Sequence, residues 1–126
     1  ITVGAALNAG FTHIDTAHDY NDQAGVGKAI RAFGGIGPFG PEQIFVTSKV
    51  PGCGVPTQGL MPPCFNNTLQ AVNDDLALLN YTSGTSTSAG VDLMLVHFPP
   101  LLGCIDANCA HMQQQWAALE VSVSMA

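Results

Sequence analysis

Short apolar runs rich in β-branched residues alternate with amphipathic helical stretches along this chain, and this alternation limits its possible folds more than any other feature. Apolar residues recur at helical spacing in four segments, as at Val26, Ile30 and Phe33. In the last segment Met112, Trp116 and Leu119 fall on one predicted face. Three compact apolar runs lie between these segments and are typical of strands. Strands separated by helices imply right-handed crossovers and a parallel sheet. We therefore predict an α/β fold of about three parallel strands, at 11–16, 43–49 and 91–98, with four helices, at 2–9, 22–33, 66–79 and 110–121.

Two parallel architectures fit this order of elements, a doubly wound sheet and a section of a (β/α)8 barrel. Periodicity does not choose between them. The first crossover lacks the glycine pattern of a dinucleotide-binding turn, because Gly25 and Gly27 lie inside a predicted helix rather than between a strand and a helix. The sequence therefore does not support a nucleotide site of the Rossmann type.

Charge and composition exclude several kinds of partner. The 126 residues are 47% hydrophobic and 10% charged, which is typical of a folded domain with a buried core. Lys28, Arg31 and Lys49 are the only lysines and arginines in a chain of net charge −6, so we expect no nucleic-acid binding. No apolar run approaches the ~20 residues of a membrane helix, and residues 1–10 lack the basic and apolar regions of a signal peptide. We therefore expect a cytoplasmic protein that binds no membrane.

The four cysteines are spaced as C-x10-C, at Cys53 and Cys64, and as C-x4-C, at Cys104 and Cys109. Neither spacing matches the paired C-x2-C units of a zinc site. We expect free thiols, with two disulfides that tether loops as the alternative and a metal site as the least favoured state.

Four polar residues stand at or just beyond the ends of the predicted strands. Asp15 ends the first strand and Tyr20 follows it, Lys49 ends the second strand, and His97 ends the third. Because the C-terminal ends of parallel strands lie on one face, where such folds bind ligands, we expect these side chains to converge. Each also has a purely structural interpretation: Asp15 as the cap of a turn, Tyr20 and Lys49 as solvated surface residues, and His97 as a hydrogen-bonded core histidine. Their shared position at strand ends favours a common site.

These residue types suit proton transfer to a carbonyl oxygen. The ordinary pKa of a tyrosine, about 10, is too high for an efficient acid at neutral pH, but a nearby lysine ammonium favours the phenolate. A carboxylate beside the lysine keeps it charged, and a histidine can donate a hydrogen bond to the carbonyl oxygen. No side chain delivers hydride, so a reduction at this site requires a cofactor.

The residues around this constellation resemble the sequence motifs of the aldo-keto reductase family. Residues 10–20, GFTHIDTAHDY, are similar to the family signature that carries an aspartate and a tyrosine. Residues 44–50, IFVTSKV, resemble its lysine strand, and residues 92–99, DLMLVHFP, resemble its histidine strand. The three motifs follow one another in the family's order, which makes the resemblance specific.

The resemblance implies a role for each site residue. Tyr20 would be the proton donor, with Lys49 promoting its acidity and Asp15 paired to Lys49. His97 would orient the substrate carbonyl, and Phe98, where the family often has Trp, would border the substrate. Asp15 and Lys49 would also contact the cofactor, which in this family is NADPH more often than NADH, and no metal is implied. The implied activity is NAD(P)H-dependent reduction of an aldehyde or ketone, a small-molecule substrate, to an alcohol, and the implied fold is a (β/α)8 TIM barrel.

The length of the chain departs from the family. A full barrel takes about 250 residues, so the resemblance implies that residues 1–126 form an incomplete aldo-keto reductase, or NADP-dependent oxidoreductase, domain that lacks most of the cofactor-binding residues. Three parallel strands cannot close, so we expect the barrel-facing side, with Ile14, Val46, Leu93 and Leu95, to be exposed. The alternative function is a catalytically incompetent fragment or scaffold, which would need a protein partner to cover the open barrel face.

Overall fold

The computed structural model describes residues 2–35, 39–40, 43–54, 59–80, 90–98 and 107–124. Within them, parallel strands alternate with α-helices, which confirms the predicted architecture of three strands and four helices. A short 3-10 helix, η1, is an addition that periodicity does not predict. The elements follow in the order α1 (Thr2–Asn8), β1 (His13–Asp15), η1 (His18–Tyr20), α2 (Gln23–Arg31), β2 (Phe45–Val50), α3 (Cys64–Leu79), β3 (Leu93–Val96) and α4 (Ala107–Ser124).

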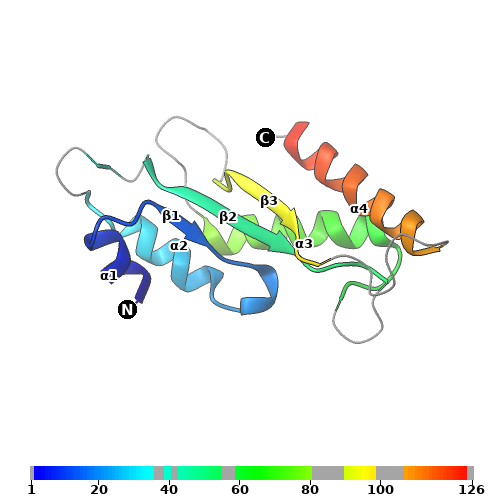
Figure 1. Ribbon diagram of the computed structural model, residues 1–126, viewed down its shortest axis with the longest axis horizontal. Coiled ribbons are helices and arrows are strands. Elements are labelled where there is room, and N and C mark those ends of the chain that lie inside the picture. The colour runs from blue at the N-terminus through cyan, green and yellow to red at the C-terminus, as the bar shows by residue number, and fades with distance from the viewer. Residues whose placement is uncertain are drawn as a thin grey trace.

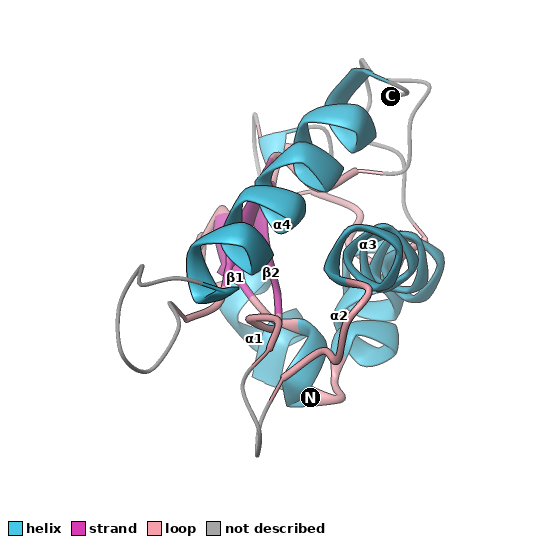
Figure 2. Cartoon of the chain, turned by 90° about the vertical axis from the view of Figure 1, so that its right-hand side faces the viewer, coloured by secondary structure: helices cyan, strands magenta, loops and turns pink. Residues whose placement is uncertain are grey.

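The three strands form an open parallel sheet in the order β1-β2-β3. Ile14 of β1 pairs with Val46 of β2, and Lys49 of β2 pairs with Leu95 of β3. The crossover helices α2 and α3 both lie behind the sheet in Figure 1. Figure 2, turned by 90°, shows the same two helices together on one side of the strands. One face of the sheet, the covered face, therefore packs on helices, and none of the described helices covers the other, which we call the open face.

The covered face packs on the helices through two clusters of buried side chains. The first cluster joins α1, α2 and β2 and includes Leu7, Ile30 and Val46. The second joins β2, α3 and α4 and includes Val50 and Leu119. Burial of these side chains is the main source of stability available to such a small sheet, because a parallel sheet needs helices against it to bury its apolar residues.

Glycines mark two places where the chain approaches itself closely or turns sharply. Gly10 has a φ of +94° and directly follows α1, the position at which a glycine commonly ends a helix. There the N–H of Gly10 donates to the carbonyl of Leu7 at 3.0 Å. Gly27 lies where α2 crosses the end of α3, and a Cβ at this position would overlap the backbone oxygen of Leu79. Only a glycine allows this approach of the two helices.

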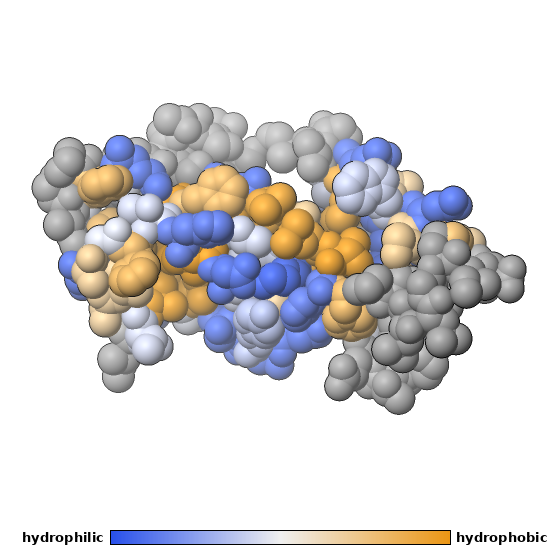
Figure 3. Space-filling model, viewed as in Figure 1, coloured by the Kyte–Doolittle hydropathy of each residue, from blue (hydrophilic) through white to orange (hydrophobic). Residues whose placement is uncertain are grey.

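The open face exposes large apolar side chains, but not all those predicted. Leu93 and Leu95 are 41% and 39% exposed, and Phe45 on the same face is 42% exposed. Figure 3 shows hydrophobic residues across this side of the sheet. The prediction is wrong for Ile14 and Val46, which pack in the first buried cluster behind the sheet. Side chains alternate between the two faces of a strand, so the register alone decides which apolar residues are covered.

The described cysteines are not free thiols, contrary to the expectation from their spacing. Cys53 and Cys64 form a disulfide that ties the loop after β2 to the first residue of α3. Cys109 is disulfide-bonded as well, whereas Cys104 lies outside the described residues. Gln115 also holds this loop, because its Oε1 accepts a hydrogen bond of 2.9 Å from the N–H of Cys53. The sequence spacing alone does not show how close the fold brings two Cβ atoms, and that distance decides whether a disulfide forms.

The last helix, α4, packs on α3 through a stripe that differs from the predicted one. Gln115, Ala118 and Leu119 are buried, whereas Trp116, predicted to share the packed face with Leu119, is 61% exposed. The indole N–H of Trp116 donates to the carboxylate of Glu120 at 2.9 Å. The apolar pattern misses this stripe because one of its members is a glutamine. None of the described helices combines the length and the apolar character that a membrane span requires.

Candidate active site

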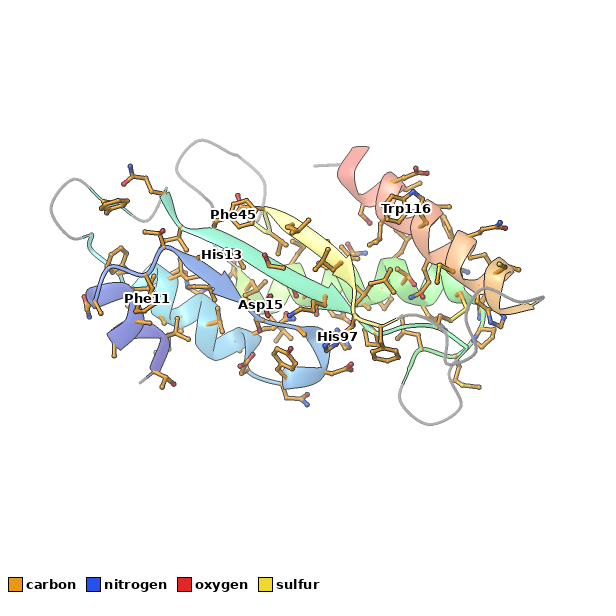
Figure 4. The ribbon with its side chains drawn as sticks, viewed as in Figure 1. Phe11, His13, Asp15, Phe45, His97 and Trp116 are labelled. Atoms are coloured by element: carbon orange, nitrogen blue, oxygen red, sulfur yellow. A yellow bond between two sulfur atoms is a disulfide. The ribbon has the colours of Figure 1, made fainter. Side chains whose placement is uncertain are left out.

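The four predicted site residues meet at one end of the sheet. Asp15 is the last residue of β1, Lys49 is the next to last residue of β2, and His97 directly follows β3. Figure 4 shows Asp15 and His97 at the C-terminal end of the strands. Tyr20 ends η1, the turn of helix that follows β1 and packs on β2. The structure thus brings together side chains that lie far apart in the sequence.

Lys49 connects the other groups of the site. Its Nζ forms an ion pair with the carboxylate of Asp15 and donates to the backbone oxygen of Thr16 at 2.9 Å and to the hydroxyl of Tyr20 at 3.5 Å. Burial by itself lowers the pKa of Lys49, but the hydrogen bonds to Asp15 and Tyr20 outweigh this effect and raise the pKa above its ordinary value of 10.5. Lys49 therefore stays protonated at neutral pH and holds a positive charge beside the hydroxyl of Tyr20.

Tyr20 and His97 lie side by side at the site, and both side chains are partly exposed. Tyr20 is 47% exposed, and its ring meets the His97 ring edge-on, with 5.5 Å between the ring centroids. Asp19 places a carboxylate oxygen 3.4 Å from Nδ1 of His97, at ion-pair distance but without hydrogen-bond geometry. An accessible phenol beside a partly exposed imidazole suits a small carbonyl group, whose oxygen can accept hydrogen bonds from both.

Phe98, predicted to border the substrate, lies next to His97. The two rings are 5.6 Å apart between centroids. The loop after β2 packs closely on Phe98, since a Cβ on Gly52 would lie 2.7 Å from its backbone oxygen and 3.0 Å from its ring. Phe98 is thus fixed beside the site, and its contact with a substrate stays a prediction.

Sequence reasoning missed three residues near the site, namely His18 and Asp19 in η1 and Asp75 in α3. Nδ1 of His18 lies 2.7 Å from a carboxylate oxygen of Asp75, which is fully buried. A signal for Asp75 exists in the sequence, because it lies three residues after Val72 and four before Leu79, on the buried stripe of α3. A carboxylate in such a position requires hydrogen-bond partners.

The charged groups of the site suit the nicotinamide end of a nicotinamide cofactor but not its phosphate groups. The exposed carboxylate of Asp15 and the hydroxyl of Tyr20, next to Lys49, can bond amide and hydroxyl groups. Phosphates need cations or clustered N–H groups, but Lys49 is paired with Asp15, and Arg31 donates to the carbonyls of Leu79 and Asn80 at the C-terminal end of α3. The remaining cation, Lys28, lies in α2, in the layer behind the sheet. Among the described residues, no three His, Cys, Asp or Glu side chains form a group suited to a metal ion.

Curated proteins similar to this chain match about three quarters of its length. It is 39% identical over 94 residues to Aldo-keto reductase family 1 member C1 of Pongo abelii, a match that covers 75% of this chain and 24% of that protein. It is 37% identical over 97 residues to an uncharacterized oxidoreductase of Schizosaccharomyces pombe, covering 77% of this chain and 24% of that protein. The chain thus spans about a quarter of the length of these relatives. No protein-family model matches the chain.

Two solved structures share the arrangement of strands and helices. One is MGS-M4, an aldo-keto reductase enzyme from a Medee basin deep-sea metagenome library, with a TM-score of 0.68 and 27% identity over 98% of this chain and 36% of that chain. The other is an aldo/keto reductase from Brucella melitensis, with a TM-score of 0.62 and 32% identity over 93% of this chain and 35% of that chain. Of the two architectures that the sequence allows, the section of a (β/α)8 barrel is therefore the one that this chain adopts.

Proposed function

We propose that the site of this chain, which is similar to aldo-keto reductases over about three quarters of its length and spans about a quarter of theirs, reduces the carbonyl group of an aldehyde or ketone to an alcohol. NADPH is the proposed reductant, with NADH as the alternative. The observation that carries the proposal is the contact of Nζ of Lys49 with both the Asp15 carboxylate and the Tyr20 hydroxyl. This contact gives a phenol the neighbours that an acid in a carbonyl reduction requires.

Tyr20 is the proposed proton donor. As the carbonyl becomes an alcohol, the phenol O–H of Tyr20 breaks and its proton forms the new O–H bond on the former carbonyl oxygen. The phenolate left on Tyr20 lies beside the ammonium of Lys49, and Asp15 keeps that ammonium oriented and charged. The exposure of Tyr20 supports this role, because the donor must reach a substrate oxygen.

The remaining site residues bind and orient in this proposal. His97 donates a hydrogen bond to the carbonyl oxygen, and the Phe98 ring beside it borders the apolar part of the substrate. Asp15 and Lys49 would hold the nicotinamide end of the cofactor, which would supply hydride to the carbonyl carbon. The partly exposed faces of His97 and Tyr20 support a shared position for the substrate oxygen.

The test is NADPH binding and aldehyde reduction by the full chain. Nicotinamide fluorescence measures binding, and the loss of NADPH absorbance measures turnover. We expect Tyr20→Phe to lower turnover by roughly 10²–10⁴-fold, the usual contribution of a general acid, with cofactor affinity largely retained because Asp15 and Lys49 remain. Tyr81→Phe makes the same chemical change elsewhere in the chain and is expected to leave turnover as it is. Turnover retained in Tyr20→Phe would contradict the proposed proton donor, and the absence of saturable NADPH binding would contradict enzyme activity of this chain.

The open face supports a second candidate function, a scaffold without catalysis. We propose that residues 1–126 form one incomplete reductase domain and that a protein partner covers Phe45, Leu93 and Leu95. Exposed apolar side chains gathered on one face are a feature of interaction surfaces. Sedimentation velocity and thermal unfolding test this function, since a monodisperse monomer that unfolds cooperatively would show that the face needs no partner.

A cytoplasmic location completes the proposal, as expected for an NADPH-dependent reductase. The Cys53–Cys64 disulfide opposes this location, because reducing compartments rarely maintain such bonds. Alkylation of free thiols at the moment of cell lysis tests it. Modified Cys53 and Cys64 would support the cytoplasm, and a disulfide protected from alkylation would contradict it.

A further inference from the structure

Each of the three residues in η1 contacts a different neighbouring element. His18 bonds to Asp75 in α3 through Nδ1, at 2.7 Å. Asp19 faces the imidazole of His97, which follows β3, and Tyr20 accepts a hydrogen bond from Lys49 in β2. A single turn of helix is therefore held from three sides, and only one of the three contacts comes from the helix layer behind the sheet.

The turn has little stability of its own. The N–H of Tyr20 donates to the carbonyl of Ala17 at 3.1 Å, and no side chain caps the start of η1. The turn ends at Asn21, in the left-handed conformation with a φ of 54°. One helical turn contains too few backbone hydrogen bonds to persist by itself. Contacts with other elements must therefore set the position of Tyr20.

The contact of His18 with Asp75 is the most constrained of the three. Asp75 is fully buried, and a buried carboxylate requires bonded partners. One of its oxygens bonds to His18, and the other accepts a hydrogen bond of 3.3 Å from the hydroxyl of Ser48. Gln23 in turn donates to that hydroxyl at 3.0 Å. Because Ser48 directly precedes Lys49, Asp75 ties both η1 and the lysine strand to α3.

We propose that Asp75 and His18 are positioning residues, which hold η1 against the sheet from the helix side and thereby keep the hydroxyl of Tyr20 within reach of Lys49. Asp75 lies behind the sheet and reaches the site only through other side chains. The inference rests on the proposed role of Tyr20 as proton donor. The placement of Tyr20 can be measured without cofactor or turnover, so the two proposals can fail separately.

The test is the nuclear Overhauser contact between the ring protons of Tyr20 and His97 in the full chain, since their ring centroids lie 5.5 Å apart. His18→Ala removes the bond to Asp75, and we expect the contact to lose most of its intensity while the methyl shifts of the buried core stay unchanged. His18→Asn puts an amide N–H close to the place of the imidazole Nδ1–H and is expected to restore the contact. A His18→Ala chain that keeps the contact overturns the inference.

His13→Ala is the matched control, because it removes another histidine, at the opposite end of β1, that bonds to Thr47 at 2.9 Å. It is expected to leave the contact between Tyr20 and His97 intact. Asp75→Leu removes the carboxylate and fills its space with an apolar side chain. A folded Asp75→Leu chain is expected to lose the contact, and its persistence would also overturn the inference. If this variant does not fold, the His18 variants decide the question.

Turnover separates a positioning role from a merely stabilising one. We expect His18→Ala to lower kcat while KM for the cofactor stays unchanged, and His18→Asn to recover kcat. If the parent chain shows no turnover and His18→Ala still loses the ring contact, only the proposed function is contradicted. Unchanged kcat and an unchanged ring contact in His18→Ala would contradict the positioning role alone.

Discussion

The two faces of the sheet are made from alternate residues of the same strands, yet they differ in what holds them. Val46 and Val50 on the covered face are fully buried against helices, whereas Phe45 and Leu95 on the open face are about two-fifths exposed. Buried apolar area stabilises the folded chain, so the covered face should carry most of its stability. The open face ends in the polar site around Lys49. Stability and proposed chemistry therefore lie on opposite faces of the same three strands.

The largest expected effect is on the free energy of unfolding, and it compares a leucine buried behind the covered face with a leucine on the open face. Leu79→Ala removes a buried side chain from the first cluster and should lower the free energy of unfolding by about 2–5 kcal/mol. Leu95→Ala makes the same change on the open face and should cost less than about 1 kcal/mol. Urea unfolding of both variants measures the difference. Equal losses would show that the open face is packed in solution and would remove the contrast.

A smaller loss of stability is expected from a substitution where α2 meets α3. Gly27→Ala places a methyl group against the backbone of Leu79, so the helices must separate, at a cost of about 1–3 kcal/mol. Gly25→Ala, in the same helix, meets no atom within 4 Å and should instead stabilise the chain by about 0.5–1 kcal/mol through helix propensity. Thermal unfolding distinguishes the two variants, and a stabilising Gly27→Ala would mean that the helices are not in close contact.

The buried carboxylate behind the sheet should make stability depend on pH. Burial raises the pKa of Asp75 above its ordinary value of 3.8, and the bond from His18 offsets this only in part. The folded state thus holds the proton more tightly than the unfolded state, so this contribution is complete below pH 3.8 and is lost as pH rises through the folded pKa. Asp75→Asn should remove this fall in the free energy of unfolding.

The test is the difference in the free energy of unfolding between the parent and Asp75→Asn across the acid range. Titratable groups away from Asp75 contribute equally to both chains and cancel in this difference. His18 on η1, Gln23 on α2 and Ser48 on β2 face the carboxylate and are retained in both chains. Asp74→Asn, on the exposed side of α3, serves as the control and should follow the parent. A difference that grows in the opposite direction would show that partners stabilise the ionised form of Asp75 more than burial disfavours it.

The smallest effect on stability is expected for polar substitutions on the open face. Leu93→Thr and Leu95→Thr should change the free energy of unfolding by less than about 1 kcal/mol, because both side chains are already partly in water. They should reduce self-association, which exposed apolar residues promote. Sedimentation velocity over a range of concentrations measures this, and unchanged association would place the contact surface elsewhere.

Local signals were enough to predict that Asp15, Tyr20, Lys49 and His97 lie together at the strand ends. Asp15, Lys49 and His97 each close a run of apolar residues, and the rule that parallel strands end on one face brings them together without any knowledge of side-chain contacts. The contact of His18 with Asp75 was not predictable in the same way, because it joins residues 57 positions apart on elements of different type. The exposed Trp116 shows a related limit, since a buried glutamine shifts the packed face of α4.

Interactions between near neighbours in the chain set the order of strands and helices, the helix end at Gly10 and the polar residues at the strand ends, so these features can be inferred from the amino-acid sequence. The three-dimensional fold was needed to show that Val46 is covered while Leu95 is exposed, and that a carboxylate in α3 contacts the turn that carries Tyr20. Both depend on register and on how helices cross, and a shift of one residue in a strand exchanges its two faces.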